Sequence, residues 1–216
     1  MATISAWPPG DIFVEAAAPD GGTGWLLTGY FVGQVSFLSL NVDPLGSSND
    51  TAPRAFAARM GPHGLVSWAA ELPCDQASTV CKGNAITPDG KGGALVCGHF
   101  NVAAYPELLM PALGFNKLQG SLSNGTTAFM MRVSDHGKIY WAKHVFSEKY
   151  STANGIASDG AGGALVVGAF AGGAMFGSSR MPQRRGRRIR DAYQGHRRRR
   201  LDQASRPPNG YVRYLV

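Results

Sequence analysis

Residues 88–100, PDGKGGALVCGHF, decide the architecture of this chain because they recur as residues 158–170, SDGAGGALVVGAF. A fainter copy surrounds Asp20. The aspartates of the three copies, Asp20, Asp89 and Asp159, lie 69 and then 70 residues apart. A fixed period of this size indicates one supersecondary unit copied along the chain, with each copy burying an apolar face against the next.

A second motif recurs out of phase with the first. Residues 55–68 contain Ala-Phe-x-x-Arg followed by a Gly and a Trp, and residues 128–141 repeat this pattern 73 positions later. Two motifs that recur in the same order define one unit of about 70 residues.

Each unit is expected to consist of strands. In the second copy, apolar or alternating runs predict strands at residues 84–87, 93–100, 127–133 and 138–145, and Asp-Gly and His-Gly turns close hairpins between neighbours. Residues 101–125 contain Pro, Gly and Ser and are expected to form a surface loop. Four antiparallel strands per repeat predict an all-β fold, a partial β-propeller with four-stranded blades of about 70 residues.

The two motifs resemble those of the SBBP-type β-propeller repeat family, whose members are large surface or secreted proteins. The resemblance covers about residues 12–177. It implies a scaffold without a catalytic signature, and a secreted or cell-surface location for the full-length protein.

The sequence divides into a partial propeller over residues 1–179 and an irregular, disordered basic tail over residues 180–216. Within the first part the expected blades cover residues 12–72, 82–146 and, incompletely, 154–177.

A closed propeller needs about four to eight blades. The chain is therefore expected to be a fragment of a longer propeller, or to self-associate through open blade faces. The aromatic residues expected in strands that face a neighbouring blade are Trp25, Phe31, Phe56, Trp68, Phe100, Phe129, Trp141 and Phe170.

The net charge of +7 is concentrated in the tail. Residues 1–179 carry 9 Lys and Arg against 12 Asp and Glu, a net charge of −3, whereas residues 180–216 carry 12 Arg and a net charge of +10. Clustered arginines can bind a polyanion, so nucleic-acid binding is expected only if the tail is genuine.

An alternative origin of the tail follows from the genetic code. The third repeat stops after Phe176, where Ala-Phe-x-x-Arg is due. Read from the last two bases of each codon and the first base of the next, residues 186–204 permit the string GDAFVMRIKATGDVVWTK, which aligns without a gap on residues 126–143. We hypothesise that the chain from somewhere in residues 178–186 to its end is an out-of-frame translation of a half-blade. Long-read sequencing of the transcript tests this hypothesis.

Candidate chemistry is sparse, and the sequence predicts no catalytic residue, cofactor site or metal site. Asp20, Asp89 and Asp159 have the oxygen ligands that Ca²⁺ prefers, but each stands alone in its turn, which favours a role as a hairpin-turn residue. His63 and His136 occupy equivalent turn positions in two repeats, and this repetition favours a structural role.

The chain has three cysteines, and the sequence does not determine whether two of them form a disulfide. Cys74 and Cys81 lie close enough in the chain to form a disulfide in an oxidising compartment, or to remain thiols. Cys97 stands in an apolar strand and is expected to be a buried thiol.

No signal peptide is visible at the amino terminus, and no apolar run reaches the length of a membrane span. The localisation is therefore left open.

The leading functional hypothesis is a non-enzymatic scaffold whose loops at residues 33–54 and 101–126 bind a protein or a glycan. The alternative is a fragment of a propeller hydrolase or lyase whose catalytic residues lie outside this chain.

Overall fold

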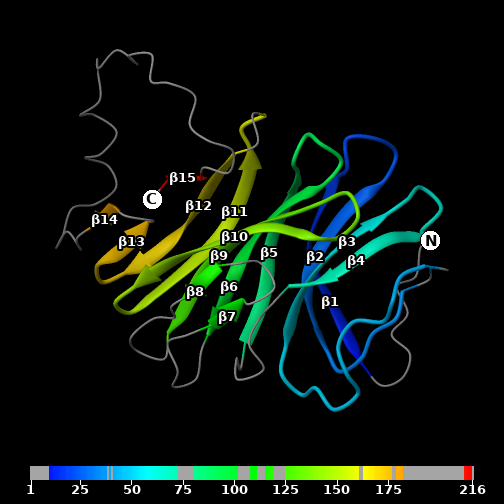
Figure 1. Cartoon of the computed structure of the whole chain (residues 1–216), viewed down its shortest axis with the longest axis horizontal. Helices are drawn as coiled ribbons and strands as arrows, with labels where there is room; N and C mark the ends of the chain where they lie inside the picture. The colour runs from blue at the N-terminus through cyan, green and yellow to red at the C-terminus, as the bar shows by residue number, and fades with distance from the viewer. Residues whose placement is uncertain are drawn as a thin grey trace.

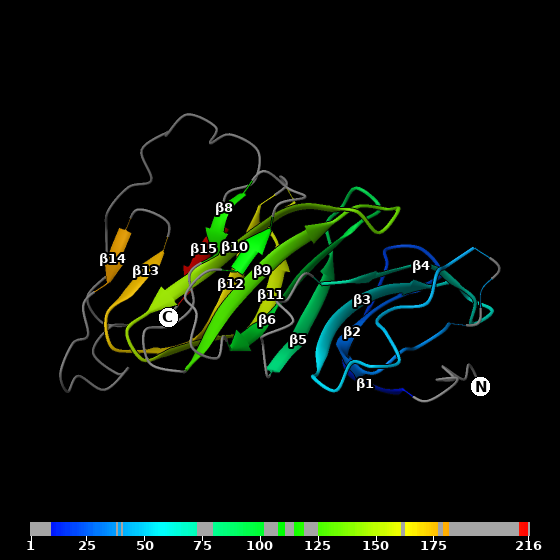
Figure 2. The ribbon, with the colours of Figure 1, turned by 60° about the horizontal axis from the view of Figure 1, so that its bottom comes forward.

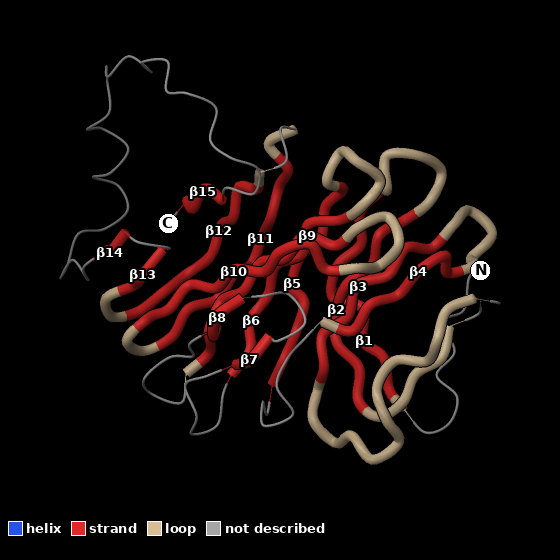
Figure 3. Tube along the Cα trace, viewed as in Figure 1, coloured by secondary structure: helices blue, strands red, loops and turns tan. Residues whose placement is uncertain are grey.

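The computed structural model describes residues 10–37, 39, 41–72, 80–101, 108–110, 115–118, 125–160, 163–176, 179–181 and 212–215. Every regular element within these ranges is a β-strand (Figures 1 and 3), which confirms the all-β prediction. No helix long and apolar enough to span a membrane occurs in these ranges.

The first sheet is an antiparallel meander whose four strands pair in chain order. Its strands are β1 (Asp11–Pro19), β2 (Trp25–Val32), β3 (Arg54–Met60) and β4 (Val66–Glu71).

The second sheet repeats this meander and adds two short strands at its outer edge, in the order β14-β13-β10-β9-β6-β5. The repeated strands are β5 (Val80–Pro88), β6 (Ala94–Asn101), β9 (Thr126–Val133) and β10 (Ile139–Ser147). The added strands are β13 (Ala174–Phe176) and β14 (Ser179–Met181).

The third sheet contains one antiparallel pair, β11 (Tyr150–Ser158) with β12 (Ala164–Ala171). A short strand, β15 (Val212–Leu215), lies parallel to the first half of β12. A separate hairpin joins β7 (Leu108–Met110) to β8 (Phe115–Leu118).

The three sheets lie in a row in chain order, as Figures 1 and 2 show. The first strand of the second sheet, β5, packs against β1 and β2 on one side and β11 on the other. The row does not close into a ring, so the finer prediction of a propeller is not established by this arrangement.

Several predicted boundaries were wrong. The first strand of the second sheet begins at Val80 rather than Asn84, because the bulge after Gly83 lets pairing continue past the glycine. The expected loop at 101–125 contains the β7–β8 hairpin, and the expected irregular tail at 180–216 contains β15 and most of β14.

The end of the third repeat also lies elsewhere than predicted. Gly172, with a φ of 81°, turns the chain out of the third sheet. Residues 174–176 then pair with β10 as part of the second sheet. This crossing is stabilised by Glu148, whose backbone N–H donates to the Gly173 carbonyl and whose carboxylate accepts from the Gly173 N–H.

Two apolar clusters lie between the sheets. The side chains of the cluster between the first and second sheets are almost completely buried. They include Trp68, Leu72, Phe100 and Phe129. The cluster between the second and third sheets is built from smaller side chains, with Phe170 only partly buried. Trp141 belongs to this second cluster, as predicted, but is also only partly buried.

A third cluster covers the face of the first sheet that points away from the second. Phe31 and Phe56 are fully buried there, but beneath Val35, Phe37 and Leu45 of the β2–β3 connection rather than beneath a neighbouring sheet. The prediction that these two rings face another blade was therefore wrong. The connection provides the apolar cover because it doubles back through a bridge between Val35 and Leu45.

Trp25 was also predicted to be buried, but 47% of its surface is exposed. It is the first residue of β2, next to the turn, and is paired only with Pro19 and Met60 at the end of the sheet.

The cysteines behave differently from one another. Cys81 is fully buried and disulfide-bonded, and the expected partner, Cys74, lies outside the described residues. Cys97 is a free, buried thiol, as predicted, and burial raises its pKa to about 12.

Candidate functional site

The repeated aspartates form the same hairpin turn three times. The backbone N–H of Asp20, Asp89 and Asp159 donates to the carbonyl of the glycine four residues later, at 3.1 to 3.2 Å. The glycine after each aspartate has a positive φ, between 73° and 87°, which favours glycine over residues with a Cβ.

The carboxylates are occupied within these turns. In Asp89, Oδ1 accepts from the Lys91 and Gly93 N–H groups, and Oδ2 accepts from Arg132 on β9 at 2.7 and 2.8 Å. Asp20 has the same contacts with Arg59, and hydrogen bonding from Gly22, followed by that from Arg59, keeps the pKa of its carboxyl low against the opposing effect of burial. These contacts support the turn interpretation of the aspartates over the calcium interpretation.

A polar cleft of about 300 Å³ opens where the β2–β3 connection meets the outer edge of the first sheet. It is lined by Asn41, Val42, Asp43 and Leu45 of the connection, by Ser67, Trp68 and Ala69 of β4, and by His136. His136 comes from the β9–β10 turn, so the cleft combines residues of two successive repeats.

The β9–β10 turn approaches β4 closely. Gly137 has a φ of 79°, and a Cβ at this position would stand 3.5 Å from the Trp68 Cβ. The His136 side chain is 83% exposed and lies 3.6 Å from the Asp135 carboxylate, measured from Nε2 to Oδ2. The cleft therefore has an exposed imidazole in its lining, with the Asp135 carboxylate next to that imidazole.

Trp68, which lines the cleft, has a buried indole N–H. Trp68 is 5% exposed, and its Nε1–H has no hydrogen-bond partner among the described residues. The equivalent Trp141 also has a buried Nε1–H without a partner among these residues. Repetition indicates that the buried indole N–H is a feature of the repeat rather than of the cleft.

A second polar group joins the inner strands of successive repeats. Asn84 stands at a bulge in β5, and its side-chain amide donates to the Ala153 carbonyl of β11 at 2.8 Å and lies 3.0 Å from His99 Nδ1. Lys82 lies over the Tyr30 ring of the first sheet at 4.0 Å. Bulges recur at the same place in β1 and β11, next to Glu15 and Asn154.

His99 is held neutral within this group. Burial lowers its pKa most, the positive charge of Lys82 lowers it further, and Glu15 partly opposes both. A neutral imidazole can accept the Asn84 hydrogen bond. These side chains satisfy one another, so the group connects the repeats rather than presenting free polar atoms.

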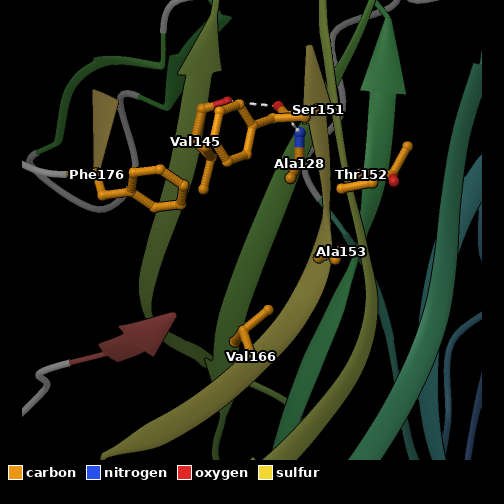
Figure 4. Close-up of a pocket in the computed structure, with 10 residues that line it drawn as sticks. Ala128, Val145, Ser151, Thr152, Ala153, Val166 and Phe176 are labelled. Atoms are coloured by element: carbon orange, nitrogen blue, oxygen red, sulfur yellow. Dashed lines mark hydrogen bonds between the residues drawn. The ribbon is translucent and has the colours of Figure 1, made fainter. Parts of the chain in front are cut away.

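A small apolar gap lies between the second and third sheets, and Figure 4 shows the side chains around it. Its volume is about 20 Å³, close to that of a single water molecule. Ser151 closes one side, donating to the Val145 carbonyl at 2.6 Å and accepting from the Ala128 N–H at 2.9 Å. The gap is a packing defect and is too small for a ligand.

A scan against protein-family models finds no match, and a search of the curated proteins finds none.

The sequence predicted only part of the cleft. Residues 33–54 were expected to bind a partner, and the cleft residues Asn41 and Asp43 lie in that segment. Ser67 was missed because it belongs to no motif, and His136 was assigned a purely structural role. Most of the second predicted loop, residues 101–126, lies outside the described residues.

Proposed function

We propose that this chain is a non-enzymatic β-propeller-type repeat scaffold of the SBBP kind, and that it binds a glycan or protein partner at the polar cleft. The support for a propeller-type array is that two sheets repeat the same four-stranded meander and that β5 packs between β1 and β11. Repeat arrays of this kind offer binding surfaces in the connections between their strands.

The observation that carries the binding proposal is the composition of the cleft. Its volume is within the range of small-molecule sites, and it offers an amide, a carboxylate, a hydroxyl and an imidazole from Asn41, Asp43, Ser67 and His136. Such groups hydrogen-bond to the hydroxyls of a sugar. A glycan is therefore the partner that this lining favours.

The position of the cleft constrains how it can be tested. Deletion of residues 33–54 would damage the fold, because Val35, Phe37 and Leu45 cover the first sheet and their loss would expose Phe31 and Phe56. Point substitutions at the polar residues are the suitable variants.

The test is binding of the purified chain to a glycan array, followed by titration calorimetry with the best glycan. Asp43→Asn and His136→Ala should each weaken binding by about tenfold, the loss expected for a hydrogen bond to a charged or well-placed group. His63→Ala is the matched control, since His63 occupies the equivalent turn of the first repeat and does not line the cleft. Absence of glycan binding, or equal affinities for all three variants, would contradict the proposal.

A further inference from the structure

The side of β12 that faces away from β11 differs from the equivalent side of β2 and β6. In the first two sheets this side is paired antiparallel with a third strand along most of its length, β3 in one case and β9 in the other. On β12 the only pairing on this side in the described part of the chain is with β15, which runs parallel and reaches from Ala164 to Val167.

The two complete sheets use one register. The Arg of Ala-Phe-x-x-Arg lies opposite Leu26 in the first sheet and opposite Leu95 in the second. The Phe of the motif lies opposite a glycine in both, Gly29 and Gly98. The equivalent positions of β12 are again a leucine and a glycine.

The glycine is required within the inner pair of strands. A Cβ at Gly98 would stand 1.9 Å from the Lys82 carbonyl oxygen of β5, and a Cβ at Gly168 would stand 2.0 Å from the Thr152 carbonyl oxygen of β11. In the second sheet the same glycine also leaves room for the Phe129 ring, which would lie 2.8 Å from a Cβ at Gly98.

The motif carries an arginine at this position because its charge pairs with the turn aspartate. Arg59 and Arg132 each reach back across the second strand to the turn aspartate of their own sheet, at 2.7 Å. Asp159 forms the same turn and accepts from the Gly163 N–H at 2.8 Å through Oδ1. A third strand in the same register would bring its arginine to the side of this turn, as in the first two sheets.

We propose that β12 accepts an added antiparallel strand that carries Ala-Phe-x-x-Arg, and that this strand is the half-repeat encoded in the shifted frame over residues 186–204. Its arginine lies opposite Leu165 and pairs with Asp159, and its phenylalanine lies opposite Gly168. Strand β15 occupies part of the same edge and must leave before the added strand binds.

The test uses a synthetic peptide, GDAFVMRIKATGDVVWTK, and the whole chain, with binding followed by fluorescence anisotropy. The peptide should bind, and removal of residues 212–216 should tighten binding because β15 no longer competes. A peptide with the Arg changed to Glu should bind at least about tenfold more weakly, as should the wild-type peptide to Asp159→Arg. The Glu peptide should recover affinity for Asp159→Arg.

The charge swap distinguishes a specific pair from a damaged turn, since a chain misfolded by Asp159→Arg would bind neither peptide. The comparison of the two peptides on the unsubstituted chain needs no variant, so it tests the pair with Asp159 even if Asp159→Arg does not fold. No binding to the chain lacking residues 212–216, or equal affinity of both peptides for the unsubstituted chain and for the Asp159→Arg variant, would overturn the proposal. This test does not involve the polar cleft, so its outcome is independent of the proposed glycan binding.

Discussion

The two interfaces between sheets are built from the same repeat but are filled to different extents. Between the first and second sheets, four strands face four strands, and Phe100 and Phe129 are 1% and 0% exposed. Between the second and third, a long antiparallel pair faces the complete sheet, Phe170 is only partly buried, and a gap remains beside it. A repeat motif thus determines which residues point inward, but burial depends on how many strands the facing sheet contributes.

The outer faces differ in a similar way. The first sheet is covered by its own connection through Val35, Phe37 and Leu45, whereas Val167 of the third sheet remains 44% exposed. The apolar surface that could recruit further chain therefore lies at the third sheet.

The largest expected effect compares equivalent phenylalanines. Phe100→Ala should lower the free energy of unfolding by about 3–5 kcal/mol, because it leaves a cavity in a closely packed interface. Phe170→Ala should cost less than half as much, because its ring is partly exposed and its surroundings already contain a gap. Urea denaturation of the two variants checks this. Equal losses would mean that the second interface is as well packed as the first.

A somewhat smaller effect on the free energy of unfolding is expected from substituting the turn aspartates of the first and second sheets. Asp89→Ala should cost about 3 kcal/mol, because its partner Arg132 is 17% exposed and would keep a largely buried charge without its carboxylate. Asp20→Ala should cost about 1 kcal/mol less, since Arg59 is 39% exposed and can be hydrated. Thermal and urea unfolding measure both. The reverse order would show that exposure of the arginine does not determine the cost.

The smallest expected effect is the loss of stability at acid pH. Burial lowers the pKa of His144 on β10 to about 4, whereas in the unfolded chain it is about 6.5. Between these pH values only the unfolded chain binds the proton, so stability should fall as the pH drops from 6.5 to about 4, by at most about 3 kcal/mol.

The control for this pH effect is substitution of the histidine. His144→Gln should flatten the dependence of unfolding free energy on pH. An unchanged slope in His144→Gln would assign the acid sensitivity to other groups.

The sequence predicted where the strands of the repeat lie better than it predicted which strands pair with one another. Strands β6 and β12 follow from the Asp-Gly-x-Gly-Gly motif, because turn chemistry and apolar runs are local signals. The docking of residues 174–176 onto β10 was missed, since a short strand can join either of two neighbouring sheets and only tertiary packing decides. A shared pattern was visible in retrospect, for Gly33 and Gly172 both have a positive φ and precede Val35 and Ala174 at the same spacing.

The candidate site was less predictable than the fold. The position of Asn41 and Asp43 depends on how the β2–β3 connection folds over the first sheet, and His136 reaches the cleft only because the second repeat packs on the first. Such relations between repeats leave no trace in a motif of one repeat.

The most direct test of the account is native-state hydrogen exchange resolved by strand. We expect the amides of β2, β3, β6 and β9 to exchange slowest, with similar free energies of opening. Those of β12 should exchange much faster, because its interface is incomplete and its third-strand side is paired only from Ala164 to Val167 in the described part of the chain. Equal protection of β6 and β12 would contradict the claim that the third sheet is an incomplete copy of the second.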